Sequence, residues 1–257
     1  MIYEANDNVR KSLVPMFEKI DSTIVQAYLQ GHMGTAYVDD LENPTVAQII
    51  VGVFVFYAGN PDTEAAEEML KNLPDFNLII VDSDDWKNRI ESVHSSGFEK
   101  FLRYRFEKDP DHLDRALMQN LLSSIPEGYE IKKVDREIAN SASFNELSED
   151  FVSQFDSVDD FLDRGKGFAV LYDGKVVSAA TSFSIYDDGL EIEIGTDPQY
   201  QRKGLAAITA SALILDCLDN GLYPSWDAAN AESAKLAEKL GYIFKEAYDT
   251  YFIDTGK

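Results

Sequence analysis

Three strand-like segments in immediate succession restrict the fold of this chain more than any other feature. They lie within "GFAVLYDGKVVSAATSFSIYDDGLEIEIGT", residues 167–196, where Asp173-Gly174 and Asp188-Gly189 mark two turns. An Asp-Gly pair between apolar segments is typical of a β-hairpin, because these residues tolerate the positive φ angles of tight turns. We therefore expect three consecutive antiparallel strands.

The elements around these strands complete a mixed α/β pattern. A strand is predicted over 129–135, and apolar residues of 148–165 recur at spacings of three and four, as in an amphipathic helix. After the three strands we expect a long helix closed by Asn220-Gly221, a short strand, a second helix and a last strand. The resulting order is β-α-β-β-β-α-β-α-β. It predicts an α/β (α+β) fold with a mixed central sheet flanked by helices.

The first half is less regular, and we expect it to form a separate α/β domain. Helical spacing over 8–30 is interrupted by Pro15, which should kink or split the helix. Two pairs of stretches are similar in their order of strands, helices and glycines: 34–59 with 167–189, and 79–106 with 224–252. We predict domains of 1–125 and 126–257, with the first either a degenerate copy of the second or an α/β unit that is similar by chance.

Composition restricts the classes of function. The chain is 45% hydrophobic and carries a formal net charge of −23, so we expect a packed core and a surface that repels nucleic acid and attracts cations such as amines. Cys217 is the one cysteine, in an apolar helical pattern, which predicts a buried thiol and no disulfide within the chain. The longest apolar run is shorter than the roughly 20 residues that span a bilayer. We expect a cytoplasmic protein without a membrane partner, and the sequence leaves its oligomeric state open.

The stretch "DPQYQRKGLAA", residues 197–207, joins the third strand to the long helix. Gly204 permits a backbone conformation that other residues avoid, and a helix starts there. The N–H groups at a helix start and the positive end of the helix dipole form an anion site, to which Arg202 and Lys203 add charge. On this stretch alone, an ordinary turn with solvated basic side chains is an equal alternative.

The wider context favours the anion site. "QRKGLA", residues 201–206, resembles the Q/R-x-x-G-x-G/A signature of the GNAT acetyltransferases, and "WDAANAESAKLAEKLGY", residues 226–242, resembles the second signature of that family. The order of elements over 129–254 fits as well, and the whole chain looks like the branch that includes the zwittermicin A acetyltransferase. The resemblance implies a GNAT fold in the C-terminal half. It also implies an acetyl-CoA-dependent N-acetyltransferase that acts on the primary amine of a small molecule by direct attack on the thioester.

The resemblance also implies the acetyl-CoA site. The loop would hold the pyrophosphate through backbone amides, the strand end would pair with the pantetheine arm, and the start of the last helix would contact the pantetheine. The residues so assigned are Ile194, Gly195, Thr196, Gln201, Arg202, Lys203, Gly204, Leu205, Ala206, Asn230 and Ser233. Asn230 is also a predicted helix N-cap, and the two roles are compatible.

The catalytic base is predicted on the third strand. Glu191 and Glu193 alternate there and so share a face, and the high cost of burying two carboxylates favours a cleft. Either one would deprotonate the attacking amine, unless this part of the strand faces solvent and both are surface charges. Many GNAT enzymes reprotonate the CoA thiolate with a Tyr on the last helix, where this chain has Ala237. Ser233 or Tyr242 would replace it, or the thiolate leaves unaided, since a thiol pKa of about 8.5 makes it a fair leaving group.

Two other functions fit the same sequence. The chain could be a catalytically silent module that binds acyl-CoA, which Ala237 favours, or a protein-interaction module. His32, His94 and His112 lie outside the matched half without metal-ligand spacing, so no metal site is predicted.

Overall fold

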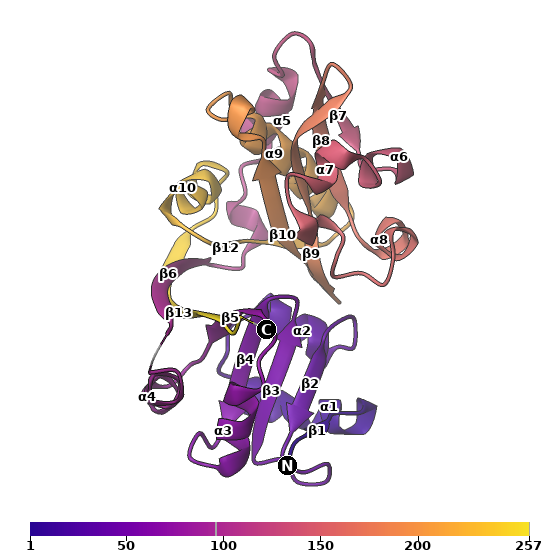
Figure 1. Ribbon diagram of the computed structural model, residues 1–257. Helices are drawn as coiled ribbons and strands as arrows, with labels where there is room; N and C mark the ends of the chain where they lie inside the picture. Colours follow the sequence, from indigo (N-terminus) through magenta and orange to yellow (C-terminus); the bar gives the residue numbers. More distant parts are fainter. Residues whose placement is uncertain (96, 257) are drawn as a thin grey trace. The chain divides into compact units, whose positions relative to one another are not determined.

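The computed structural model describes residues 1–95 and 97–256 and contains two mixed β-sheets. Contacts divide the chain into a first unit, Met1–Arg103 with Tyr248–Lys257, and a second unit, Tyr104–Ala247. The predicted boundary after residue 125 therefore lies inside the second unit. Two strands, β6 (Glu99–Phe106) and β13 (Phe244–Asp254), each begin in one unit and end in the other (Figure 1).

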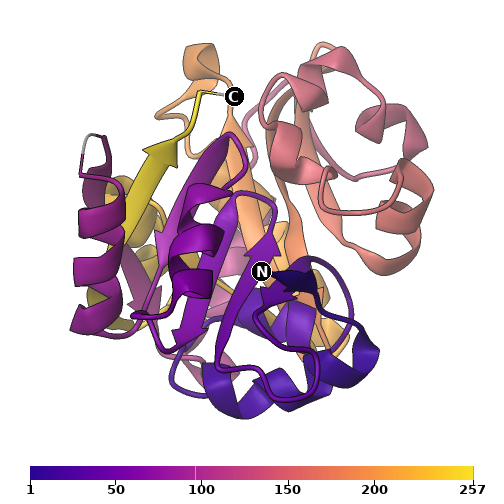
Figure 2. The same cartoon turned by 60° about the horizontal axis from the view of Figure 1, so that its bottom comes forward.

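The first unit is a twisted sheet with helices packed on it. Its strands are β1 (Tyr3–Glu4), β2 (Thr35–Val38), β3 (Val46–Val51), β4 (Phe54–Gly59) and β5 (Phe76–Ile80), in the order β1-β2-β3-β4-β5-β13. Its helices are α1 (Asp7–Phe17), α2 (Thr23–Leu29), α3 (Glu64–Lys71) and α4 (Asp84–Val93). Figure 2 shows α3 in front of this sheet with α4 beside it.

Two stretches of the first half are divided in the structure. Residues 44–59 contain a long apolar run in the sequence, but β3 and β4 form a hairpin around Gly52, whose φ is 57°. Glycine allows that left-handed turn inside an otherwise continuous β pattern. Pro15 lies within α1, and the helical pattern breaks just after it, between Phe17 and Thr23.

The core of the first unit depends on both of its chain segments. Trp86 of α4 stacks on Tyr57 of β4 at 5.0 Å between ring centroids, and its indole N–H donates to the carbonyl oxygen of Gly59 at 3.1 Å. Tyr251 and Ile253 of β13 are buried in the same cluster. The hydrophobic core of this unit is therefore incomplete without the segment after residue 247.

The second unit contains the predicted succession of strands. The strand order is β11-β10-β9-β8-β7, from β7 (Tyr129–Lys133), β8 (Gly167–Tyr172), β9 (Lys175–Tyr186), β10 (Gly189–Thr196) and β11 (Tyr223–Ser225). The helices are α5 (Arg115–Ser123), α6 (Arg136–Ala139), α7 (Ala142–Asn145), α8 (Val158–Arg164), α9 (Leu205–Asp219) and α10 (Ala231–Lys239), and short 3-10 turns cover Pro110–His112, Glu149–Phe151 and Pro198–Tyr200. The three predicted consecutive strands correspond to β8, β9 and β10.

The helix predicted over 148–165 is split into the turn Glu149–Phe151 and α8. Ser148 and Ser157 each accept a hydrogen bond from a backbone N–H two or three residues later, from Asp150 and Asp160 respectively. Each serine therefore starts a new short helix and competes with a continuous one.

Helices cover both faces of this sheet. Thr209 of α9 contacts Ser178 of β9 on one face, whereas Gly195 of β10 lies against Leu147 and Phe151 on the other, where an added Cβ would come within 3.1 Å of the Phe151 ring. In Figure 1, α9 and α5 lie on one side of the strands, and α6, α7 and α8 on the other.

The second hairpin turn differs from the prediction. Asp187 and Asp188 form it, and Gly189 is already the first residue of β10, opposite Tyr186. A Cβ on Gly189 would lie 2.0 Å from the carbonyl oxygen of Tyr223 in β11. Glycine is therefore required here for close approach of two strands and not for a left-handed turn.

Gly189→Ala is expected to lower the free energy of unfolding by about 2–4 kcal/mol, because the added methyl group pushes β11 away from β10. Gly174→Ala is the matched control. Gly174 has a φ of 74° with open space around its missing Cβ, so alanine should cost only about 1–2 kcal/mol there. Urea unfolding followed by circular dichroism compares the two variants. Equal losses would contradict the steric role of Gly189.

Candidate functional site

The site is built where β10 and β11 separate. These strands run parallel over Gly189–Tyr223, Leu190–Pro224 and Glu191–Ser225 only. The chain then continues as β12 (Asp227–Ala228), which pairs with β6 instead. Among the residues that the structure describes, no strand pairs with this edge of β10 beyond Glu191. The later half of β10 therefore presents a strand edge to which an extended ligand can add.

The loop after β10 contains two residues in the left-handed region. Arg202 has a φ of 62°, and Gly204, the residue before α9, has a φ of 80°. The left-handed region is costly for arginine, and such strain is concentrated at functional sites. A left-handed residue followed by helical ones turns successive N–H groups to one side, an arrangement that binds anions. None of the described side chains caps α9, so its first N–H groups are suited to bind a ligand.

A pocket of about 330 Å³ lies at this helix start. It is lined by Thr196, Tyr200, Gln201, Arg202, Gly204, Leu205, Ala206, Ala207, Glu232, Leu236 and Lys239. The predicted cofactor residues that it brings together are Thr196, Gln201, Arg202, Gly204, Leu205 and Ala206. The wall from α10 was not predicted, although the spacing of Glu232, Leu236 and Lys239 by four and three residues puts them on one helix face.

Buried hydroxyl groups fix the end of β10 against the first turn of α9. The Thr209 hydroxyl contacts the backbone oxygen of Leu205 at 2.7 Å and the Ser178 hydroxyl at 3.1 Å. Ser178 in turn lies 2.8 Å from the hydroxyl of Thr196 and 3.2 Å from the carbonyl oxygen of Gly195. Because Thr196 and Leu205 both line the pocket, this network holds two of its parts at a fixed separation.

An ion pair holds the start of the same loop. The Lys175 ammonium lies 2.8 Å from a carboxylate oxygen of Asp197, whose other oxygen accepts the backbone N–H of Gln199 at 2.9 Å. The hydrogen bond from Lys175 keeps the pKa of Asp197 below its ordinary value. Asp197 therefore stays charged and fixes the turn that leads to Arg202.

A family comparison agrees with this geometry. The model of the GNAT acetyltransferases matches residues 14–251. The chain belongs to the GNAT acetyltransferase family. It is 30% identical to the uncharacterized N-acetyltransferase YdfB of Bacillus subtilis (strain 168), over 98% of this chain and 98% of that protein.

Solved structures of GNAT proteins are similar to this chain. The crystal structure of a GCN5-related N-acetyltransferase-like protein from Streptococcus suis 89/1591 shares 37% identity, with a TM-score of 0.87 over 95% of this chain and 98% of that one. The structure of a tandem GNAT protein from the clavulanic acid biosynthesis pathway is also similar. The alignment covers 100% of this chain and 99% of that protein, with a TM-score of 0.54. At 9% identity that likeness concerns the fold alone.

Some residues that the GNAT resemblance assigns to acetyl-CoA have other contacts in this enzyme. Lys203 donates a hydrogen bond from Nζ to the hydroxyl of Tyr129 at 3.1 Å. The Asn230 side chain accepts the backbone N–H of Glu232 and of Ser233, and so caps α10 as predicted. The Ser233 hydroxyl accepts the indole N–H of Trp226 at 3.0 Å. Ile194 and Gly195 lie on the part of β10 beyond its pairing with β11.

The environments of the two candidate bases differ. Glu191 is only 5% exposed, and its charge adds to burial in raising the pKa values of Tyr186 and Tyr223. Glu193 is half-buried, and its carboxylate accepts a hydrogen bond from the Ser148 hydroxyl at 3.1 Å. Alternation along β10 predicts a shared face, but the pairing of β10 with β9 shifts in register between Glu191 and Ile192. Glu193 is the more accessible of the two to a substrate.

Tyr242 has a structural role. Its hydroxyl donates to the carbonyl oxygen of Pro224 at 2.5 Å in a buried site, and burial raises its pKa well above the ordinary value. A proton on this oxygen is already engaged with the backbone of β11. Tyr242 is therefore poorly placed to protonate a leaving thiolate.

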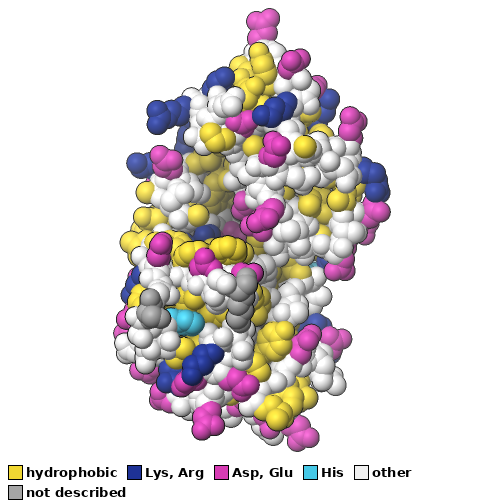
Figure 3. All heavy atoms as spheres, viewed as in Figure 1, with side chains coloured by type: hydrophobic (Ala, Val, Ile, Leu, Met, Phe, Trp, Pro, Cys, Tyr) yellow, Lys and Arg dark blue, Asp and Glu magenta, His cyan; other side chains and the backbone are white. Residues whose placement is uncertain are grey.

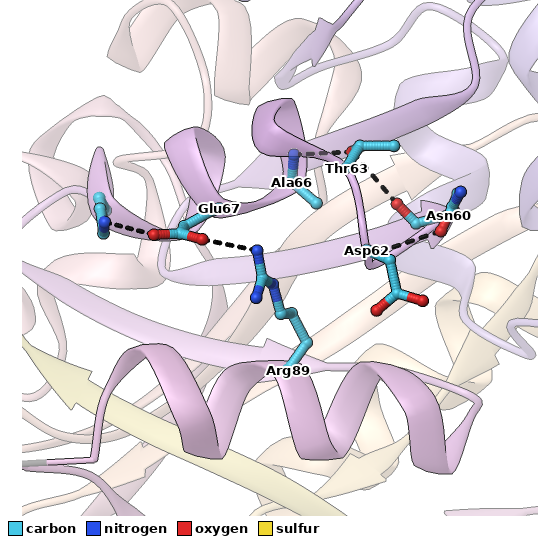
Figure 4. Close-up of polar contacts among 7 residues, drawn as sticks. Asn60, Asp62, Thr63, Ala66, Glu67 and Arg89 are labelled. Carbon is cyan, nitrogen blue, oxygen red and sulfur yellow. Dashed lines mark hydrogen bonds and ion pairs between the residues drawn. The ribbon is translucent and has the colours of Figure 1, made fainter.

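The start of α3 in the first unit, which also follows a sheet strand and a short loop, is built differently (Figure 4). Thr63 accepts the backbone N–H of Ala66 at 3.1 Å and so caps α3, while its hydroxyl donates to the backbone oxygen of Asn60. Glu64 and Glu67 add negative charge in the first turn, and Glu67 is engaged with Arg89 at 2.6 Å. A capped and acidic helix start does not favour a phosphate.

Other predicted features can be located as well. In the described part of the chain, no three His, Cys, Asp or Glu side chains are grouped so that they could hold a metal ion.

His94 is partly buried against the carbonyl oxygen of Leu70, and burial lowers its pKa. Cys217 is buried, which raises the pKa of its thiol to about 12. Over residues 1–95 and 97–256, no helix has the length and apolarity needed to cross a bilayer.

Arg202→Gly is expected to be about 1–2 kcal/mol more stable than the matched variant Gln201→Gly in the absence of ligand. Both changes add the same freedom to the unfolded chain, but only position 202 is left-handed, since Gln201 has a φ of −61°. Urea unfolding of the two variants gives the difference. If they are equally stable, the backbone of Arg202 is not strained.

Proposed function

We propose that this GNAT enzyme transfers an acetyl group from acetyl-CoA to the primary amine of a small molecule. The observation that carries the proposal is the uncapped start of α9 after left-handed Gly204, next to the open edge of β10. An anionic pyrophosphate suits the helix start, and an extended pantetheine arm suits the strand edge. The use of acyl-CoA by the family supports this assignment.

The order of residues along the chain orients the cosubstrate. With the pyrophosphate at Gly204 and the guanidinium of Arg202 beside it, the pantetheine arm runs back along β10 from Thr196 toward Ile194. Leu236 of α10 supplies an apolar contact on the opposite wall of the pocket. The thioester end then lies near Glu193.

Glu193 is the residue that we assign as the general base. The acceptor nitrogen forms a bond to the thioester carbonyl carbon, the C–S bond breaks, and the carboxylate of Glu193 takes the proton that the nitrogen loses. The hydrogen bond from Ser148 orients that carboxylate. Acetyl-CoA supplies a leaving thiolate whose conjugate acid has a pKa of about 8.5, so departure without a protein acid is feasible.

The charge of the chain supports a cationic acceptor. The formal net charge is −23, and acidic side chains are spread widely over the face seen in Figure 3. Such a surface attracts ammonium groups at long range, and salt weakens the attraction. A panel of small primary amines, followed by thiol release from acetyl-CoA with the full chain, tests the function. For a cationic acceptor, KM should rise with salt.

A catalytically silent acyl-CoA-binding module is the second candidate. Ala237 at the usual tyrosine position and the engaged hydroxyl of Tyr242 favour it. CoA binding without thiol release for any amine in the panel would support this alternative. The finer placement of the chain in the branch of the zwittermicin A acetyltransferase stays a prediction, as does the assignment of the first unit as a degenerate GNAT-like repeat.

Gly204→Ala is expected to weaken acetyl-CoA binding about tenfold or more. The added methyl group would stand where the pyrophosphate approaches and would keep it from a hydrogen bond with the backbone N–H groups, and a hydrogen bond to a charged group is worth about this factor. Gly174→Ala is the matched control, because both glycines have positive φ and an open space around the missing Cβ. Both variants should lose similar stability. Titration calorimetry measures the affinity for acetyl-CoA. Equal affinities in the two variants would contradict the proposal that the pyrophosphate binds at Gly204.

Glu193→Gln is expected to lower kcat by roughly 10²–10⁴-fold while acetyl-CoA affinity is kept, since it removes the proton acceptor. Part of the loss should be recovered as pH rises and more of the amine is unprotonated. Glu191→Gln is the control on the same strand, and its rate should stay close to that of the unchanged chain. If Glu191→Gln alone lowers the rate, Glu191 and not Glu193 is the general base.

A further inference from the structure

Three tyrosine rings form a cluster beside the loop 201–204 that precedes α9. Tyr129 of β7 and Tyr172 of β8 are 4.6 Å apart between ring centroids, and Tyr200, in the turn before the loop, is 6.4 Å from the first and 5.8 Å from the second. Tyr129 and Tyr200 pack against a core cluster that includes Leu205 and are thereby fixed. Tyr172 is 40% exposed, so this aromatic surface is open to a ligand.

Lys203 is held on the same cluster. Its Nζ donates to the Tyr129 hydroxyl at 3.1 Å and lies 4.9 Å from the ring centroid of Tyr200 and 5.9 Å from that of Tyr129. This arrangement combines a hydrogen bond with cation–π contacts. The ammonium group is therefore kept at the aromatic surface.

Lys203 has no carboxylate partner among the described residues, although Asp and Glu outnumber Lys and Arg by 46 to 23. Other lysines of the chain pair with acids, for example Lys175 with Asp197 at 2.8 Å. A positive charge that is positioned by neutral groups can accept an anion without first breaking a salt bridge. The cluster therefore offers a ring surface and an uncompensated cation together.

The position of the cluster identifies its ligand. Tyr200 also lines the pocket at the start of α9, and Lys203 directly precedes Gly204. A group that follows the pyrophosphate out of the pocket on this side meets the rings and the ammonium group. We infer that the surface of Tyr129, Tyr172 and Tyr200 binds the adenine ring of CoA and that Lys203 binds its 3′-phosphate. This inference rests on the proposed use of acetyl-CoA.

The chemistry of both groups fits. An adenine ring stacks on an aromatic side chain, and such a contact is worth a substantial part of nucleotide affinity. The alternative cation is Lys239, which lines the pocket from α10. Glu232 lies on the same wall of α10 and opposes an anion there. The aromatic side of the pocket is therefore favoured over the α10 side for the nucleotide.

Titration calorimetry on the full chain tests the inference with three probes: CoA, dephospho-CoA, which lacks the 3′-phosphate, and 4′-phosphopantetheine, which lacks the nucleoside. The unchanged chain should bind CoA about 10–100-fold more tightly than dephospho-CoA, the range of a hydrogen bond to a charged group. Lys203→Met should bring this ratio close to one, whereas the matched Lys239→Met should keep it.

Tyr172→Ala should weaken CoA and dephospho-CoA by the same factor, about 5–100-fold, and leave 4′-phosphopantetheine binding unchanged. Tyr3→Ala, at a tyrosine of equal exposure in the first unit, is the control and should change none of the three affinities. Thermal unfolding of each variant verifies that it is folded.

Three results would overturn the inference while the unchanged chain still binds CoA. The preference for CoA over dephospho-CoA could be unchanged in Lys203→Met, it could disappear in Lys239→Met instead, or Tyr172→Ala could bind CoA with normal affinity. If the unchanged chain does not bind CoA at all, the proposed function fails as well. The two failures are therefore distinguishable.

Discussion

The separation of β11 from β10 after Glu191 is the constraint on which the rest of the site depends. An unfilled strand edge gives up backbone hydrogen bonds, so the departing segment must be stabilised elsewhere. β12 pairs with β6, the Trp226 indole donates to Ser233, and the rings of Trp226 and Tyr242 meet edge to face at 5.5 Å. These contacts fix α10 opposite the start of α9 and so create the second wall of the pocket.

The two units contain similar strand-to-helix connections, but the starts of α3 and α9 differ in their suitability for an anion. Each has a sheet strand that leads through a short loop into a helix, β4 into α3 and β10 into α9. Thr63 and two glutamates occupy the start of α3, whereas α9 begins with a left-handed glycine and no acidic residue in its first turn. A few side chains at a helix terminus therefore account for the difference, on backbones of similar construction.

Local signals in the sequence predicted the hairpin at Asp173-Gly174, the long helix α9 and the loop that ends at Gly204, because each depends on neighbouring residues. The sequence did not predict the α10 wall or the position of Lys203 on Tyr129, since these contacts join residues far apart in the chain. Gly189 was assigned to a turn because an Asp precedes it, but contact with β11 determines its role. The difference in burial between Glu191 and Glu193 likewise results from tertiary packing, which alternation along a strand cannot supply.

The discontinuous first unit has a consequence for the order of folding during synthesis. The Asn77 side chain contacts the carbonyl oxygen of Ile253, 176 residues later, and Tyr251 is part of the same core. The first 103 residues leave the ribosome early but lack the strand that covers the outer edge of β5 until translation has passed residue 250. The second unit is one continuous segment, so it is complete sooner. The first unit therefore cannot be completed before the second has been synthesised, in contrast to the usual vectorial order in which the N-terminal domain is complete first. Until then the outer edge of β5 is an unpaired strand edge, which is a template for pairing with other chains.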